Sequence, residues 1–98
     1  MAVQQDLKKI RRRLATLQRA MGRVGPVMRG SIVVIGMRNK QPYFSLNKGG
    51  RTRIIYLGQK RQHLARQYAD NYKRLQEIVE EMTELNMILL KRDYQQKP

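Results

Sequence analysis

The residues of this chain that can do chemistry are mostly basic, and a dense group of them surrounds a pair of glycines. In the stretch PYFSLNKGGRTRIIYLG (residues 42–58), Lys48, Arg51 and Arg53 flank Gly49 and Gly50. Guanidinium and ammonium groups suit contact with phosphates, since they combine positive charge with several hydrogen-bond donors. The glycines lie between two predicted strands and not before a helix, so they indicate a tight turn and not a phosphate-binding loop.

Two sets of basic residues are predicted to contact the phosphate backbone of a nucleic acid. The first set lies on a predicted N-terminal helix and comprises Lys8, Lys9, Arg11, Arg12, Arg13, Arg19 and Arg23. The second set lies on a predicted sheet, its turns and the start of the next helix, and comprises Arg38, Lys40, Lys48, Arg51, Arg53, Lys60, Arg61 and Arg66.

The charge is concentrated in one part of the chain. The 98 residues include 21 Lys and Arg against 7 Asp and Glu, a formal net charge of +14. Residues 1–66 hold 16 basic residues and one acidic residue, whereas residues 67–98 hold 5 and 6. Such self-repulsion favours a polyanionic partner.

Composition also limits the class of protein. The chain has no cysteine, which excludes disulfides, thiolate chemistry and cysteine-ligated zinc, and fits a cytoplasmic location. The longest apolar runs are far shorter than the ~20 residues that span a bilayer, so we expect no signal peptide and no membrane partner.

Few residues suggest catalysis. His63 is the single histidine and has no nearby carboxylate or nucleophile in the sequence, so we expect a solvated side chain. Four acidic residues flank an apolar stripe, where they can solvate the helix, pair with arginines of the first helix or repel polyanions: Glu77, Glu80, Glu81 and Glu84. We therefore predict no enzyme, no catalytic residue, no cofactor and no metal.

Hydrophobic periodicity predicts a basic amphipathic helix over 6–22. Its apolar residues recur at intervals of three and four and are Leu7, Ile10, Leu14, Leu17 and Met21. Asp6 is the expected N-terminal cap, and Gly22, Gly25 and Pro26 end the helix.

From residue 30 to 58 the pattern predicts a three-stranded antiparallel meander, with turns at 37–40 and 47–50. Pro42 should begin the middle strand or face away from the hydrogen-bond ladder. Alternation places Arg51 and Arg53 on one face of the last strand, and Ile54 and Tyr56 on the other. If Ile54 and Tyr56 face inward, the arginines stand on an open face, where Tyr43 or Phe44 could stack on bases.

A long helix is predicted over 60–91, with a frayed tail at 93–98. Its heptad-like stripe is Leu64, Tyr68, Leu75, Ile78, Met82, Leu85 and Leu89, with Asn71 as a polar member. The first helix folded back on it, a second copy in a homodimer, or both must cover this stripe. The prediction is one α+β domain over 1–98: N-terminal helix, three-stranded antiparallel β-meander and long coiled-coil-like C-terminal helix.

The order of motifs from Met28 to Lys91 resembles a family of small uncharacterised proteins from bacterial and archaeal mobile elements. The matching pieces are Arg29-Gly30-Ser31, Pro42-Tyr43-Phe44-Ser45-Leu46, Gly50-Arg51-Thr52-Arg53, Asn71-Tyr72 with Leu75, and Leu85-Asn86. Many members carry a cysteine knuckle between the first two strands, which residues 36–41 replace here, so no metal is carried over. The stretch GGRTRIIYLG is also similar to the arm-site-binding domains of integrases, whose three-stranded sheet docks in the major groove.

The sequence thus leads to two hypotheses. The first is a non-enzymatic nucleic-acid-binding protein of a phage or mobile element, for either DNA or RNA, that grips the phosphate backbone with the basic helix and hairpin. The alternative is an interaction, inhibitor or assembly protein whose basic surface docks on a nuclease or a nucleoprotein complex.

Overall fold

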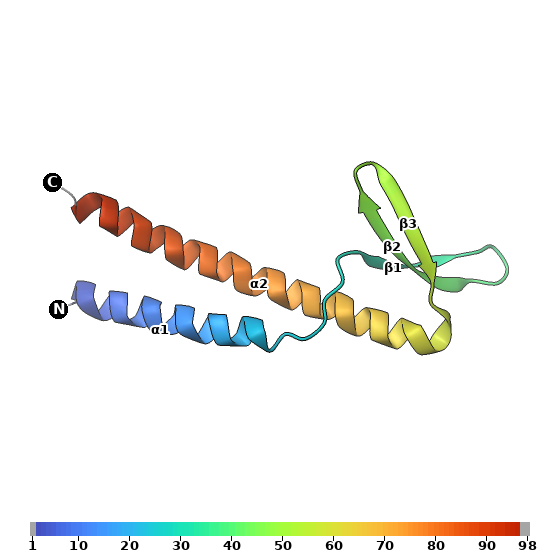
Figure 1. The fold of residues 1–98 in the computed structure, drawn as a ribbon, viewed down its shortest axis with the longest axis horizontal. Helices are drawn as coiled ribbons and strands as arrows, with labels where there is room; N and C mark the ends of the chain where they lie inside the picture. The colour runs from blue at the N-terminus through green and yellow to red at the C-terminus, as the bar shows by residue number, and fades with distance from the viewer. Residues whose placement is uncertain (1, 97–98) are drawn as a thin grey trace. The chain divides into compact units, whose positions relative to one another are not determined.

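The computed structural model describes residues 2–96, and side chains from Asp6 to Asp93. The elements are helix α1 (Ala2–Gly22), strands β1 (Ser31–Ile35), β2 (Gln41–Lys48) and β3 (Arg51–Tyr56), and helix α2 (Gly58–Gln96) (Figure 1). This order confirms the predicted α+β fold. The chain forms two compact units: a helical unit of residues 1–24 and 74–98, and a sheet unit of residues 25–73. The first part of α2 belongs to the sheet unit and the rest of α2 to the helical unit.

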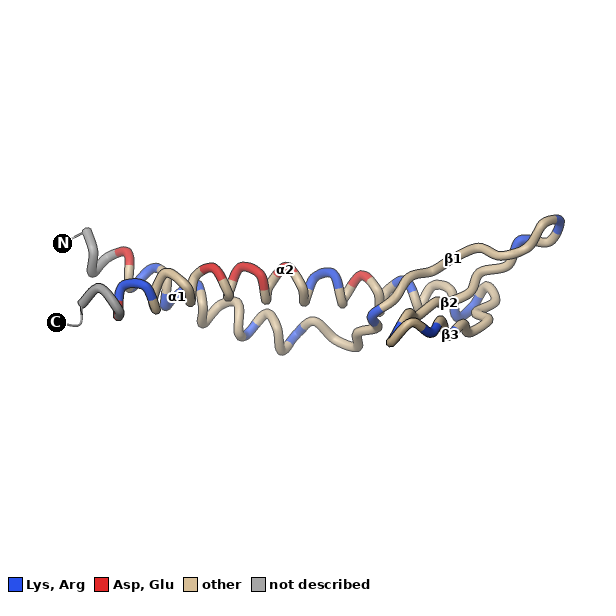
Figure 2. The backbone as a smooth tube through the Cα atoms, turned by 90° about the horizontal axis from the view of Figure 1, so that it is seen from above, with Lys and Arg blue, Asp and Glu red and all other residues tan. Residues whose placement is uncertain are grey.

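In the helical unit, α1 runs antiparallel to the C-terminal part of α2 (Figures 1 and 2). Leu17 and Ile78 form the best-buried positions, at 2% and 1% exposure. Both lie on the apolar stripes predicted for their helices, and burial of such stripes is the main stabilising term for helix pairs. Within the chain, the apolar stripe of α2 is therefore covered by α1, which folds back on it.

Both helices are longer than predicted. Because α1 begins at Ala2, Asp6 lies inside the helix and the N-cap prediction for it was wrong. Its carboxylate instead lies 3.9 Å from the guanidinium of Arg92 on α2. The frayed tail was also wrong for residues 93–96, since α2 continues to Gln96; residues 97–98 lie outside the described part.

The sheet unit contains an antiparallel sheet in the order β1-β2-β3. Gly49 and Gly50 form a two-residue turn at φ of 58° and 76°, backbone angles that glycine adopts without strain. Asn47 and Lys48, predicted within the turn, instead end β2. Pro42 is the second residue of β2, close to the predicted start, and its carbonyl accepts from the Leu57 amide at 3.0 Å.

One face of the sheet packs on the first turns of α2. The buried cluster is Phe44, Leu57 and Ala65, against which Met28, Ile32 and Leu46 pack. Leu64, predicted in the packing stripe, is 46% exposed, and its neighbour Ala65 is buried in its place. The small side chain of Ala65 lets the sheet approach the helix closely enough to enclose the Phe44 ring.

Two hydrogen bonds tie the segment before β1 to α2. The Asn71 side-chain amide donates to the Pro26 carbonyl at 2.8 Å, and the Met28 amide donates to the Tyr68 carbonyl at 3.1 Å. Asn71 thus satisfies a loop carbonyl, which explains a polar residue within an otherwise apolar stripe.

Candidate nucleic-acid interface

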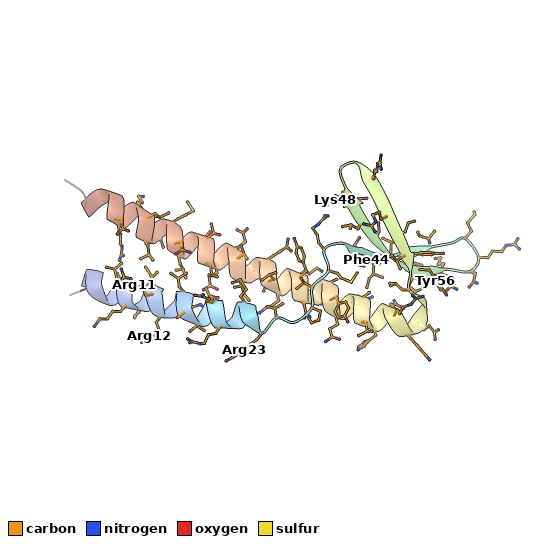
Figure 3. The ribbon with its side chains drawn as sticks, in the orientation of Figure 1. Arg11, Arg12, Arg23, Phe44, Lys48 and Tyr56 are labelled. Carbon is orange, nitrogen blue, oxygen red and sulfur yellow. The ribbon has the colours of Figure 1, made fainter. Side chains whose placement is uncertain are left out.

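A line of cations runs along the exposed side of α1. At 100° per residue, Lys8, Arg12, Arg19 and Arg23 fall within about 60° of arc, opposite the stripe that contains Leu17. All four are exposed, and Figure 3 shows Arg12 and Arg23 pointing away from α2. We call these four residues the α1 cation line; it spans about 22 Å at a rise of 1.5 Å per residue.

Arg23 belongs to this line although it follows the last residue of α1. Its amide donates to the Ala20 carbonyl at 3.0 Å, so the backbone continues to turn beyond Gly22. Lys9 and Arg11 are also exposed and flank the line on either side.

Arg13, predicted to contact phosphate, has a partner within the chain. Its Nε and Nη2 donate to the two carboxylate oxygens of Glu81 at 2.6 and 2.9 Å. This bidentate pair lowers the pKa of Glu81 and raises the pKa of Arg13, in each case mainly through the hydrogen bond between them. Of the predicted roles for the acidic residues, pairing with the first helix is confirmed at Glu81.

The Arg13–Glu81 pair predicts a dependence of stability on pH. A carboxylate with a lowered pKa stabilises the folded state above its unfolded pKa of about 4.3, and this contribution disappears as the pH falls through the folded pKa. We expect Glu81→Gln to lower the melting temperature at pH 7 and to have a smaller effect at pH 3. Glu80→Gln, at an exposed position, is the matched control in thermal unfolding at both pH values. An equal loss at both pH values for Glu81→Gln would contradict the assignment.

The basic residues of the hairpin lie on the face of the sheet that packs on α2. A cationic ribbon that is open to a ligand would need them on the other face. Arg53 pairs with Leu46, and Ile55 pairs with the buried Phe44, so these side chains share the face that meets α2. Lys48 and Arg51 pair at the end of the same face. Leu57, which has the same parity as Arg53 and Ile55, lies in the core cluster with Phe44. The premise that Ile54 and Tyr56 face inward was therefore wrong.

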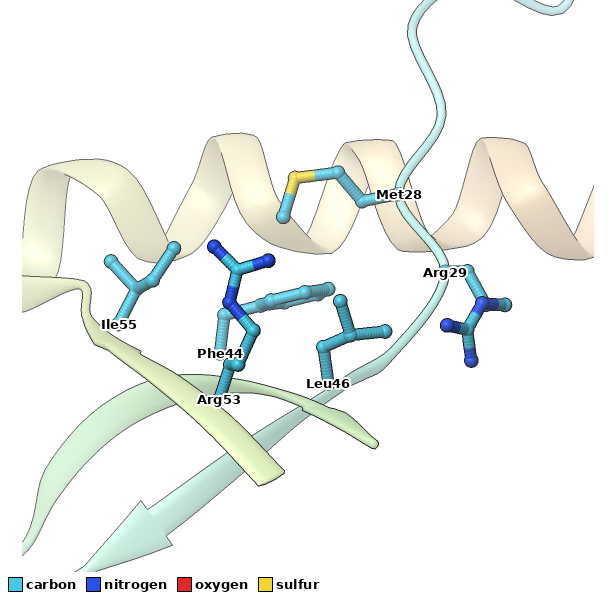
Figure 4. A pocket seen from close by; sticks show the side chains of 6 residues that line it. All are labelled: Met28, Arg29, Phe44, Leu46, Arg53 and Ile55. Carbon is cyan, nitrogen blue, oxygen red and sulfur yellow. The ribbon is translucent and has the colours of Figure 1, made fainter. Parts of the chain in front are cut away.

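The Arg53 side chain is nevertheless accessible to solvent, because it lines an open hollow next to the core residue Phe44. This hollow has a volume of about 280 Å³ and is lined by Met28, Arg29, Phe44, Leu46, Arg53 and Ile55 (Figure 4). Nη1 of Arg29 donates to the Asn47 carbonyl at 3.1 Å, which holds that guanidinium against the hairpin. Arg51, Arg53 and Lys48 are all exposed, so they are accessible to an anion.

The other face of the sheet carries two tyrosines that the sequence did not single out as a pair. Tyr43 on β2 is opposite Tyr56 on β3, and their ring centroids lie 5.4 Å apart at an interplanar angle of 65°. Phe44, the alternative stacking residue, is buried at the core. The alternation of β3 predicts that Tyr56 lies on the face opposite Arg53. Only the register with β2 shows that Tyr56 is paired with Tyr43.

The remaining predicted phosphate contacts are exposed. They are Arg38 and Lys40 in the turn between β1 and β2, and Lys60, Arg61 and Arg66 in the first turns of α2. Arg61 donates through Nε to the Leu57 carbonyl at 3.0 Å, so its guanidinium is partly committed to the end of β3.

His63 is exposed on α2 and lines an open hollow together with Arg66, Gln67, Asp70 and Asn71. Between Asp6 and Asp93, no hydrogen bond joins His63 to Asp70, and no group of three His, Asp or Glu side chains is placed to hold a metal ion. Over the same part of the chain, no helix combines the length and the apolar character needed to cross a membrane.

The predicted helix-packing stripe is used within the chain in the helical unit. Ile78 is buried, and Leu75, Met82, Leu85 and Leu89 are partly buried on the side of α2 where α1 packs. A homodimer through this same stripe would have to displace α1. Different residues of α2 are apolar and exposed, namely Val79, Met87, Ile88 and Leu90.

Comparison of the chain with protein-family models, curated proteins and solved structures gave no significant match.

Proposed function

We propose that this protein is a non-enzymatic nucleic-acid-binding protein that contacts the phosphate backbone through the α1 cation line. The observation that carries the proposal is the position of Lys8, Arg12, Arg19 and Arg23 on one exposed side of the helical unit, opposite its apolar stripe. Within that unit, Arg13 lies beside the line and pairs with Glu81; among the described side chains, the salt bridges join Arg13, Arg74 and Arg92 to acidic residues and do not include the four residues of the line.

The arrangement suits a polyanion because the charges form an extended row. One strand of duplex DNA carries a phosphate about every 3.4 Å of helix axis, so a row of about 22 Å spans several phosphates. Each neutralised phosphate releases condensed counterions, which gives a favourable entropy that falls as salt rises. Residues 7–69 contain no Asp or Glu, so the second basic set adds to the same attraction.

The test is the salt dependence of binding, measured by fluorescence anisotropy with labelled duplex DNA between about 50 and 200 mM salt. The variant Arg12→Gln/Arg19→Gln/Arg23→Gln removes three charges from the line. We expect the slope of log K against log salt to become shallower by about 2–3, since each phosphate contact contributes roughly 0.9, and the affinity at low salt to fall on the order of tenfold or more.

A matched control removes the same charge from helix α2. Lys73→Gln/Arg74→Gln/Lys91→Gln changes three exposed basic residues of α2. It should leave the slope nearly unchanged if the line on α1 makes the contacts. Equal effects of the two triple variants would show that only net charge matters, and absence of binding by the wild-type protein at 50 mM salt would refute the proposal.

A further inference from the structure

One face of the sheet is left without a covering element in the sheet unit. We call it the outer face; it consists of Val33 on β1, Tyr43 and Ser45 on β2, and Ile54 and Tyr56 on β3. The start of α2 packs on the opposite face, against Phe44 and Leu57. Ile54 and Tyr56 are 52% and 47% exposed, and Val33 and Tyr43 are partly buried; Ile55 on the opposite face of β3 is also 54% exposed. Contiguous apolar and aromatic surface of this kind marks binding sites more often than chance exposure.

The tyrosines of the outer face are held in position. The Tyr56 hydroxyl donates to the Gln41 side-chain carbonyl at 3.1 Å, and the Gln41 amide donates in turn to the Asn39 side chain at 2.9 Å. Gly58 lies beside the Tyr56 ring: a Cβ added there would be in van der Waals contact with the ring at 3.7 Å, and the φ of +65° would strain any other residue. With the edge contact to Tyr43, these interactions fix a pair of rings before any ligand arrives, which reduces the entropic cost of binding.

The charge around this face identifies the kind of ligand. No acidic residue occurs in the sheet unit before Asp70. Arg38 and Lys40 stand in the turn at the end of the sheet where the tyrosines lie, and Lys60 follows β3 at the start of α2. A ligand that matches both features carries negative charge at regular intervals and flat apolar groups between the charges.

We propose that the outer face binds unpaired bases of a single-stranded nucleic acid, with Tyr43 and Tyr56 as the stacking residues and the neighbouring cations as phosphate contacts. The inference rests on the proposed function and adds its ligand class. Bases in a duplex are stacked on each other and hide their faces, whereas a single strand exposes them to aromatic side chains. An acidic protein offers charge but no flat group to lie against the exposed Tyr56 and the partly buried Tyr43 beside it.

The experiment compares two tyrosine variants on two probes, an unstructured dT15 strand and a duplex of the same length. We expect Tyr43→Leu and Tyr56→Leu each to weaken dT15 binding by roughly 5- to 100-fold, the range for loss of one stacked base. Tyr43→Phe retains the ring and should bind within about twofold of wild type. The salt slope should stay unchanged, because no charge is removed.

Controls separate this inference from the proposed function. Met37→Ala removes an exposed apolar side chain from the adjacent turn and should not change binding, and circular dichroism of each variant confirms the fold. Duplex affinity should remain at the wild-type value in both leucine variants. If the protein binds duplex and dT15 but the leucine variants bind both normally, the stacking site is refuted and the α1 cation line stands; if wild type binds neither probe, both proposals are wrong.

A second readout depends on direct contact and not on affinity. Photocrosslinking of a dT15 probe that carries 5-bromodeoxyuridine should yield peptides modified at Tyr43 or Tyr56. Crosslinks confined to α1 would overturn the outer-face site even if the affinities changed.

Discussion

Replacement of Phe44 by alanine is expected to unfold the sheet unit. Phe44 is 4% exposed and lies between the sheet and Ala65 of α2. Removal of a buried phenylalanine costs about 3–5 kcal/mol, from lost burial and from the cavity left behind. A whole domain of this size has only about 5–15 kcal/mol of stability, so the unit loses a large share of it.

Amide hydrogen exchange followed by mass spectrometry measures this effect locally. We expect peptides from β1, β2 and β3 to lose protection in Phe44→Ala, because local unfolding follows the stability of the unit. Ile54→Ala is the matched control, since it truncates a half-exposed side chain on the outer face of the same sheet. Equal loss of protection in the two variants would show that the core does not lie on the Phe44 face.

Replacement of Ile78 by alanine is expected to have the second largest effect, on the helical unit. Ile78 is the most deeply buried side chain between residues 6 and 93, and α1 covers it. Removal of a buried isoleucine costs about 2–5 kcal/mol. We therefore expect α1 to exchange its amide hydrogens faster and the helical signal in circular dichroism to fall at a lower temperature.

The residue next to Ile78 supplies the control. Val79 lies one position along α2 but is half-exposed, so Val79→Ala should change the melting temperature by much less than Ile78→Ala. A similar loss in both variants would mean that the Val79 side of α2 is also covered in solution, for instance by a second copy of the chain. Light scattering at the concentration of the melt distinguishes that outcome.

The two variants also connect stability to binding. The α1 cation line depends on a helix whose stability comes mainly from packing, since in proteins the packing of an apolar face stabilises a helix more than its residue propensities do. Ile78→Ala should therefore weaken duplex binding while leaving the sequence of the line intact.

The sequence by itself determined the elements of this protein. The change of hydrophobic period from about 3.6 to 2 and back located α1, the three strands and α2, because the period follows from backbone geometry alone. The paired glycines at 49 and 50 located the hairpin turn, since few other residues tolerate positive φ at both positions. Helix ends were less certain: Asp6 resembled a cap but lies within α1, because nothing in the four residues before it stops a helix.

The tertiary structure decided which side of each element is free. On β3 both faces carry apolar residues, Ile55 on one and Ile54 with Tyr56 on the other, so alternation alone is ambiguous. The register with β2 resolves it, because Ile55 is opposite Phe44 and Phe44 packs on Ala65. That register places Arg51 and Arg53 on the same face as Phe44, and Tyr43 and Tyr56 on the other face.

The same holds for the basic residues of α1. The sequence gives their types and spacing, but it does not show that Arg13 has a partner within the chain while its basic neighbours face solvent. Only the antiparallel return of α2 brings Glu81, 68 residues away, to Arg13 and leaves the opposite side of α1 to solvent. Local periodicity is a property of consecutive residues, whereas pairing and exposure depend on contacts between distant segments, and these form only when the chain folds.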